Sequence, residues 1–138
     1  MGDDLGASNV NRSYSLAATS IAIFTFMLIF LYPKFAGGQV DSLLFHATLM
    51  VMALATFSFV FASLHYYGAS LGGRIGDAAR SQYSRRGDRF WLAGYTLLFL
   101  DPALILFSVQ LRVAASVWLA LWVVYLLFVV RFFPRVQS

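Results

Sequence analysis

The chain has 138 residues, of which 60% are hydrophobic and 12% are charged, and its mean hydropathy is +0.74. A soluble domain of this length cannot bury so much apolar surface, so the composition indicates a membrane protein. The formal net charge of +4 does not indicate nucleic-acid binding, because the basic residues stand beside apolar runs, where membrane topology explains them.

The residue types also limit the chemistry. The chain has no cysteine, which excludes disulfides, thiol catalysis and cysteine-ligated zinc or iron–sulfur sites. No catalytic motif stands out, so we expect a protein that is not an enzyme.

Four apolar runs meet the length of roughly 20 residues that a helix needs to cross a bilayer. They cover residues 13–32, 42–67, 90–111 and 114–133. The first run follows a polar, acidic segment without the basic region of a secretory signal peptide, so we interpret it as a retained span. The sequence therefore predicts one all-α transmembrane domain, a bundle of four antiparallel helices.

The distribution of basic residues predicts the orientation of these helices. The N-terminus, the segment 68–89 and the C-terminus hold eight of the ten basic residues. We therefore expect both termini and the loop 68–89 to face the cytoplasm, in a bacterial cytoplasmic membrane. Part of this loop would form a short amphipathic helix on the lipid headgroups. The arginines expected to face the headgroups are Arg74, Arg80, Arg85, Arg86 and Arg89.

Asp101 lies near the middle of the third run, where an aspartate costs on the order of 2.5–3.5 kcal/mol to insert. Gly94 and Ser108 lie one heptad away on either side, so they share a small, polar helix face with Asp101. Such a face is expected against other helices or a cavity. The functional interpretation is a proton or cation site, because burial favours the protonated carboxyl and protonation would gate or drive transport.

Asp101 also has a structural interpretation. Pro102 follows it directly, and aspartate followed by proline is typical of a helix start, with the aspartate as N-cap. Since proline lacks an N–H, we expect the third helix to be kinked or broken at Asp101–Pro102. The two interpretations are compatible, because broken helices often build midplane sites.

The second run carries a polar stripe. Asp41, Thr48, Thr56 and Ser63 recur at spacings of seven or eight residues, which places them along one helix face. One hypothesis is a cation path with Asp41 at its outer mouth. The alternative is helix packing, in which the hydroxyls bond to their own backbone.

The two histidines, His46 and His65, both lie on the second run. A helix places them about 28 Å apart, so one chain cannot use both for a single metal ion or haem. We expect no cofactor, although a homodimer that holds haem b between symmetry-related His46 or His65 side chains is an alternative.

These observations predict a small homo-oligomeric channel or transporter for protons or cations, with Asp101 as its intramembrane site. The ion pathway would consist of Asp101, Asp41, Thr48, Thr56, Ser63 and Ser108. The alternative is a non-catalytic accessory or anchor subunit of a larger membrane complex. Expected partners are lipids and either further copies of the chain or other membrane proteins.

Overall fold

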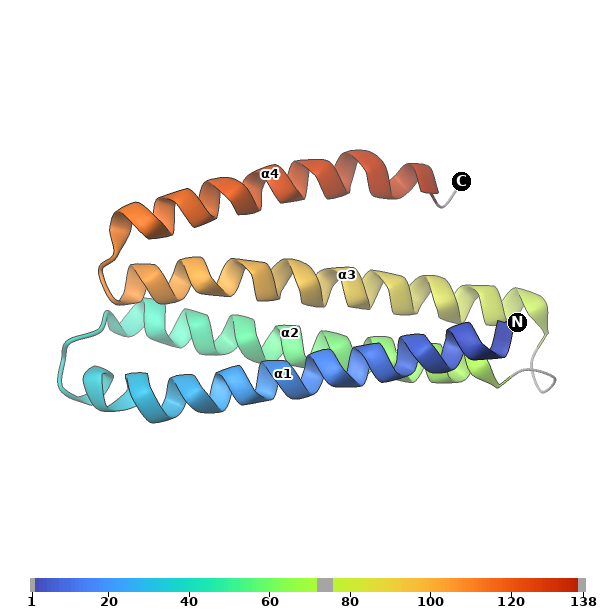
Figure 1. Ribbon diagram of the computed structural model, residues 1–138, viewed down its shortest axis with the longest axis horizontal. Coiled ribbons are helices and arrows are strands. Elements are labelled where there is room, and N and C mark those ends of the chain that lie inside the picture. The colour runs from blue at the N-terminus through green and yellow to red at the C-terminus, as the bar shows by residue number, and fades with distance from the viewer. Residues whose placement is uncertain (1, 72–75, 137–138) are drawn as a thin grey trace.

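The computed structural model describes residues 2–71 and 76–136, with side chains for residues 7–71 and 76–131. The described residues form four helices, which are α1 (Gly2–Ala36), α2 (Ser42–Ser70), α3 (Asp77–Ser108) and α4 (Arg112–Val136). Consecutive helices run antiparallel (Figure 1), and all four are long and apolar enough to cross a membrane. The predicted all-α bundle of four antiparallel membrane helices is therefore confirmed.

The helices pack in chain order. α2 lies between α1 and α3, and α4 makes its extensive contacts with α3 alone. Figure 1 shows α4 on the outside of the bundle, and it is the least buried of the four helices. Many of its apolar side chains are exposed, as with Leu121 at 62% and Leu127 at 67% exposure. Such an apolar surface requires hydrocarbon or another helix around it.

α2 and α3 meet in a register that repeats every seven residues. The large buried residues of α2 on this repeat are Phe45, Met52, Phe59 and Tyr66. The buried residues of α3 on the same repeat are Gly87, Gly94, Asp101 and Ser108. We call these two rows together the α2–α3 seam. A period of seven keeps such rows in contact along two helices.

Glycine allows the large side chains of the seam to reach the facing helix. A Cβ atom added at Gly94 would lie 2.8 Å from the Phe59 ring, and one added at Gly87 would lie 2.8 Å from the Tyr66 ring. These two contacts define an antiparallel register in which Met52 faces Asp101 and Phe45 faces Ser108. Small residues at such positions let membrane helices approach closely and gain packing energy.

The two short connections lie at one end of the bundle and end their helices in the same way. Gly38 (φ +71°) and Gln110 (φ +64°) each adopt the left-handed conformation just after a helix. In both turns the next residue donates its N–H to the carbonyl five residues back, at 2.9 Å. This Schellman arrangement satisfies carbonyls that a helix end leaves free.

Two features of the helices differ from the sequence-based expectation. α3 begins at Asp77, within the expected loop 68–89, and residues 77–89 continue into the span without a separate amphipathic helix. Packing of Tyr66 on Gly87 holds these first turns against α2. Of the kink or break expected at Asp101–Pro102, the break is absent, because α3 runs through Pro102 as one helix; the kink stays a prediction. A packed membrane helix can accommodate a proline when neighbouring helices support it.

Substitution of Gly94 by alanine tests the seam. The new Cβ would clash with the fully buried Phe59 ring, so we expect Gly94→Ala to lower the free energy of unfolding by about 1–3 kcal/mol. Unfolding in mixed detergent micelles, followed by circular dichroism, measures this loss. Gly76→Ala is the control, because a Cβ added there meets nothing within 4 Å. Equal stability of Gly94→Ala and the wild type would contradict the register.

Candidate intramembrane site

Asp101 is enclosed in the middle of the bundle. Its side chain is 1% exposed, and neither carboxylate oxygen has a hydrogen-bond partner among the described residues. Asp101 follows Arg89 by about 18 Å of helix and precedes the end of α3 at Ser108 by about 10 Å, so it lies well inside the apolar span. An N-cap aspartate would accept backbone N–H groups. Because neither carboxylate oxygen of Asp101 has a partner among the described residues, the structure does not show this N-cap role. An unpaired buried carboxyl group is costly and needs an explanation.

A pocket of about 210 Å³ is lined in part by Asp101, whose carboxylate oxygens have almost no accessible surface. All four helices contribute to its wall, with Ile23 from α1, Met52 from α2, Trp118 from α4, and Asp101 among the residues from α3. We call it the Asp101 pocket. Among the described residues that line it, Asp101 alone is charged, and the others are apolar or aromatic.

The hydroxyl groups of α2 do not turn toward Asp101. Thr48 and Thr56 lie one helical turn on either side of Met52, which faces Asp101 across the seam. Thr48 donates its hydroxyl to the Leu44 carbonyl at 2.8 Å, and Thr56 donates to the Met52 carbonyl at 2.9 Å. Both side chains therefore have the bonds of the packing alternative, as serine and threonine often do within helices.

The remaining residues of the expected ion pathway lie along the same seam. Asp41 is the N-cap of α2 and accepts the Leu44 N–H at 2.9 Å. Its own N–H donates to the Ser108 carbonyl at 3.4 Å, so Asp41 and Ser108 are brought together at one end of the bundle. The Ser108 hydroxyl donates to the Ile105 carbonyl at 2.7 Å.

Ser63 lies apart from Asp101. It is fully buried, and its hydroxyl has no partner among the described residues. Eleven residues separate it from Met52, which is about 16 Å along the helix. Phe59, which is fully buried, fills the seam between these levels. Within one chain, the polar residues of the expected ion pathway therefore lie where the helices are closely packed. The open space near Asp101 is the Asp101 pocket.

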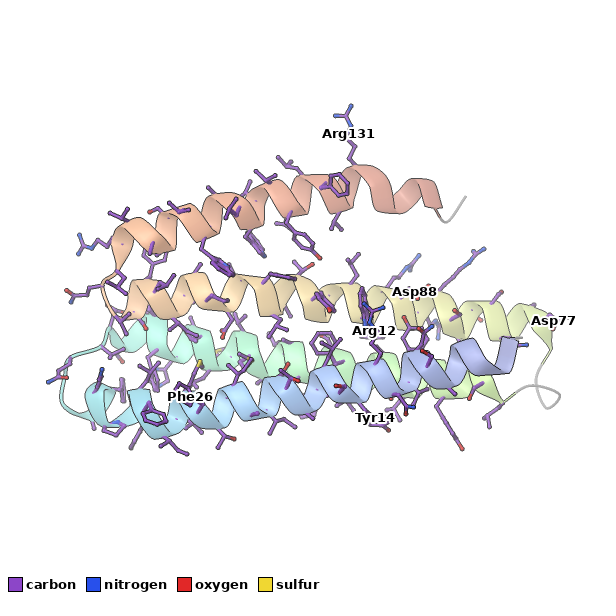
Figure 2. All side chains as sticks on the ribbon, viewed as in Figure 1. Arg12, Tyr14, Phe26, Asp77, Asp88 and Arg131 are labelled. Carbon is purple, nitrogen blue, oxygen red and sulfur yellow. The ribbon has the colours of Figure 1, made fainter. Side chains whose placement is uncertain are left out.

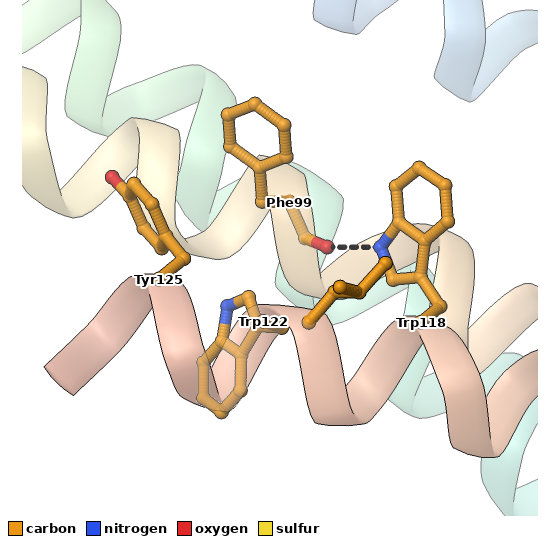
Figure 3. Close-up of a pocket in the computed structure, with 5 residues that line it drawn as sticks. Phe99, Trp118, Trp122 and Tyr125 are labelled. Atoms are coloured by element: carbon orange, nitrogen blue, oxygen red, sulfur yellow. Dashed lines mark hydrogen bonds between the residues drawn. The ribbon is translucent and has the colours of Figure 1, made fainter. Parts of the chain in front are cut away.

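Two tryptophans of α4 fasten this helix to α3. The Trp118 indole N–H donates to the Phe99 carbonyl at 2.7 Å, and the Trp122 indole N–H donates to the Thr96 carbonyl at 2.8 Å. Figure 3 shows these side chains around a second pocket of about 220 Å³. The sequence analysis missed this role, although tryptophans four residues apart lie on one helix face and so signal a shared contact.

Pro102 acts in the same turn of α3. Because proline has no N–H, the Leu98 carbonyl loses its usual helical donor. The next carbonyl, that of Phe99, is the one that accepts the Trp118 indole N–H. The weakened turn of α3 is thus supported from α4, and Trp118 is held against the Asp101 pocket.

The opposite end of the seam carries a polar contact that the sequence analysis also missed. Tyr66 donates its hydroxyl to Asp88 Oδ1 at 2.7 Å, and the Arg12 guanidinium lies 4.8 Å from the centre of the Trp91 ring. Figure 2 shows Arg12 and Asp88 in the half of the bundle where α3 begins at Asp77. These contacts join α1, α2 and α3 toward the end of the bundle where α3 begins.

The arginines expected at the headgroups occupy this end as well. Arg85, Arg86 and Arg89 are exposed and Arg80 is partly buried, all on the first turns of α3. Arg74 lies outside the described residues.

The histidines are well separated on α2, as expected. His46 and His65 each place Nδ1 near the backbone carbonyl four residues earlier, at 2.7 and 2.8 Å. Nε2 is then the nitrogen that would bind a haem iron in a homodimer. Among the described residues, no group of three histidine or aspartate side chains is arranged to hold a metal ion.

Comparison with known proteins adds no assignment to this geometry. The sequence matches no family model, and neither the curated proteins nor the solved structures compared with it contain a match.

The unpaired carboxyl group of Asp101 leads to a prediction about the free energy of unfolding. Replacing a buried, unsatisfied polar group with an apolar one removes its desolvation penalty, and the adjoining pocket gives a larger side chain room. We expect Asp101→Leu to raise the free energy of unfolding by about 1–3 kcal/mol. Detergent unfolding of the two proteins measures the difference.

Thr48→Val is the matched control. It removes a buried hydroxyl that already has a partner, so it should give no comparable gain. A destabilised Asp101→Leu variant would show that Asp101 makes a stabilising interaction in the folded protein.

Proposed function

We propose that this protein is a small, non-enzymatic channel or transporter for protons or cations, and that Asp101 is its intramembrane site. The observation that carries the proposal is the Asp101 carboxyl group, which is 1% exposed and lacks a hydrogen-bond partner among the described residues. Ionisable groups inside membranes are costly to keep and commonly mark ion or substrate routes. A bound proton or cation would neutralise the carboxylate and remove that cost.

The packing of the bundle favours a homo-oligomer. Phe45, Met52 and Phe59 fill the α2–α3 seam, so a single chain offers little space for a continuous route. The outer faces of α4 are apolar and exposed, which suits contact between copies within the bilayer. A route along Asp101 would then run between copies.

The arrangement of charges supports cytoplasmic termini. The N-terminus, the start of α3 and the C-terminus lie at one end of the bundle (Figure 1), together with Arg12, Arg131 and the arginines of α3. Lys34 and Arg112 lie at the other end, beside the two short connections. The positive-inside rule places the arginine-rich end in the cytoplasm, and we propose a bacterial cytoplasmic membrane as the location.

Flux measurements test the proposed function. The protein is reconstituted into liposomes, and proton, sodium and potassium fluxes are followed for the wild type and for Asp101→Asn. We expect the flux of the conducted ion to fall by about tenfold or more in the variant, because the amide cannot neutralise a cation.

Asp77→Asn is the matched control for this experiment, since Asp77 is an exposed carboxylate in the first turn of α3. Its flux should equal that of the wild type. Equal flux through the wild type and Asp101→Asn, or no flux through either, would refute the proposal.

Cysteine labelling tests the orientation. The chain contains no cysteine, so in a single-cysteine variant the introduced thiol is the one that a maleimide labels. We expect a membrane-impermeant maleimide to label Gln39→Cys in intact cells, and to label Ser81→Cys only after the membrane is opened. The reverse pattern would show that the arginine-rich end faces outward.

An accessory subunit is the second candidate function. The observation that favours it is the position of α4, which is the least buried helix and makes its extensive contacts with α3 alone. Such a helix can pack against a larger membrane protein as readily as against a second copy. Purification in mild detergent separates the candidates, because an accessory subunit copurifies with its complex and conducts nothing by itself.

A further inference from the structure

We propose that the outer face between α3 and α4 binds one anionic phospholipid, with an acyl chain in the pocket of Figure 3 and the phosphate on Arg85 and Arg89. We call this space the α3–α4 pocket. The proposal concerns a face of the bundle that the ion pathway does not use, so it does not depend on transport. It rests on the apolar pocket, on the two arginines beyond its end and on the distance between them.

The α3–α4 pocket is apolar and reaches the surface of the bundle. It has a volume of about 220 Å³, and the residues that line it are Phe99 of α3 and Trp118, Leu121, Trp122 and Tyr125 of α4. Phe99, Trp118 and Leu121 are 43%, 38% and 62% exposed, so a lipid chain can enter from the side. From Trp118 to Tyr125 the lining extends about 11 Å along α4, which suits a length of acyl chain.

Two arginines lie on the same face of α3, closer to its start. The carbonyls of Thr96 and Phe99 accept the indole bonds from α4, which identifies the face of α3 that is turned toward α4. The residues at spacings of three or four along this face are Arg85, Arg89, Leu92, Thr96 and Phe99. Such spacings keep side chains on one face of a helix, so both arginines are in line with the pocket.

The depth of the arginines matches the headgroup layer. Trp122 bonds to the Thr96 carbonyl, and α4 runs antiparallel to α3, so Tyr125 lies at about the level of Ala93. Arg89 is about 6 Å farther along α3 from this outer end of the pocket. The polar layer on each side of the hydrocarbon is about 5–8 Å thick. A phospholipid with its chain in the pocket therefore places its phosphate near the arginines.

Arg85 and Arg89 suit a phosphate group. They are one helical turn apart, which separates their Cβ atoms by about 6 Å, and guanidinium groups bind phosphate oxygens in bidentate fashion. Both side chains are exposed, and neither has an ion-pair or hydrogen-bond partner among the described residues. The neighbouring Asp88 accepts the Tyr66 hydroxyl of α2 at 2.7 Å. Two arginines without a carboxylate partner favour a lipid with a net negative charge.

Quenching of tryptophan fluorescence tests the proposal, because Trp118 and Trp122 line the pocket. The chain has three tryptophans, so Trp91→Phe leaves these two, and the full chain with this substitution is reconstituted into phosphatidylcholine nanodiscs. A minor fraction of the lipid is replaced by brominated phosphatidylglycerol or, in a parallel sample, by brominated phosphatidylcholine with the same chains. We expect phosphatidylglycerol to quench about threefold more strongly, or more.

Two charge-matched double variants assign this preference to the site. Arg85→Gln with Arg89→Gln should reduce the ratio of the two quenching strengths to about one. Arg86→Gln with Arg131→Gln removes the same charge from exposed arginines at the same end of the bundle, and it should leave the ratio unchanged. Arg86 is turned by about 100° from Arg85 around α3, and Arg131 points away from α3 (Figure 2).

A soluble competitor separates a lipid from a free phosphate. Glycerol phosphate carries the phosphate chemistry without an acyl chain, and sodium sulfate at equal ionic strength is its control. Glycerol phosphate should lower the quenching by brominated phosphatidylglycerol no more than sulfate does. A larger effect of glycerol phosphate would show that the arginines bind phosphate without help from the pocket, and it overturns the proposal.

The remaining outcomes are equally decisive, and two of them require no arginine variant. Equal quenching by the two brominated lipids shows ordinary contact with the bilayer and overturns the proposal. Absence of quenching by both lipids shows that protein, such as a second copy of the chain, covers the pocket, which also overturns it. An equal loss of preference in the two double variants shows general attraction of anionic lipid to this end of the bundle, and refutes a defined site.

Discussion

The close approach of α2 and α3 is the constraint on which the rest of the structure depends. Large side chains of α2 enter gaps that Gly87 and Gly94 leave on α3, with Cβ positions only 2.8 Å from the Tyr66 and Phe59 rings. In a bilayer, where lipid tails are as apolar as the side chains, such packing is a main source of helix association. The register that results holds the first turns of α3 against α2 and sets Asp101 opposite Met52.

Asp101 occupies a position of the seam where the neighbouring heptads carry glycine or serine. A carboxyl group there loses water and gains no hydrogen bond from the described residues, so packing alone does not explain its presence. The tryptophan bonds from α4 give the same region a wall that the three other helices cannot supply. Asp101, Pro102 and Trp118 therefore belong to one arrangement, in which a weakened turn of α3 is supported from α4 beside an open pocket. Stability and function are expected to oppose each other at this position.

Much of this fold could be predicted from the sequence, because long apolar runs in a bilayer have few alternatives to helices. The heptad of Gly94, Asp101 and Ser108 also indicated a face turned away from lipid, and all three residues are buried. The start of α3 was placed too late, since the arginine-rich segment 77–89 looks like a loop until Tyr66 and Gly87 are seen in contact. The bonding of the α2 hydroxyls and the anchoring by Trp118 and Trp122 depend on side-chain directions and on neighbouring helices.

The sequence by itself determined that this protein lies in a lipid bilayer, how many helices it has and how charge is distributed between the two ends of the bundle. Those properties follow from composition and from distance along the chain, and they need no knowledge of contacts. Only the tertiary structure decided that Asp101 lies unpaired beside an aromatic pocket while the hydroxyls of α2 bond to their own backbone. That distinction arises from the register of two helices and the position of a third, because a shift of one residue turns each side chain by about 100°.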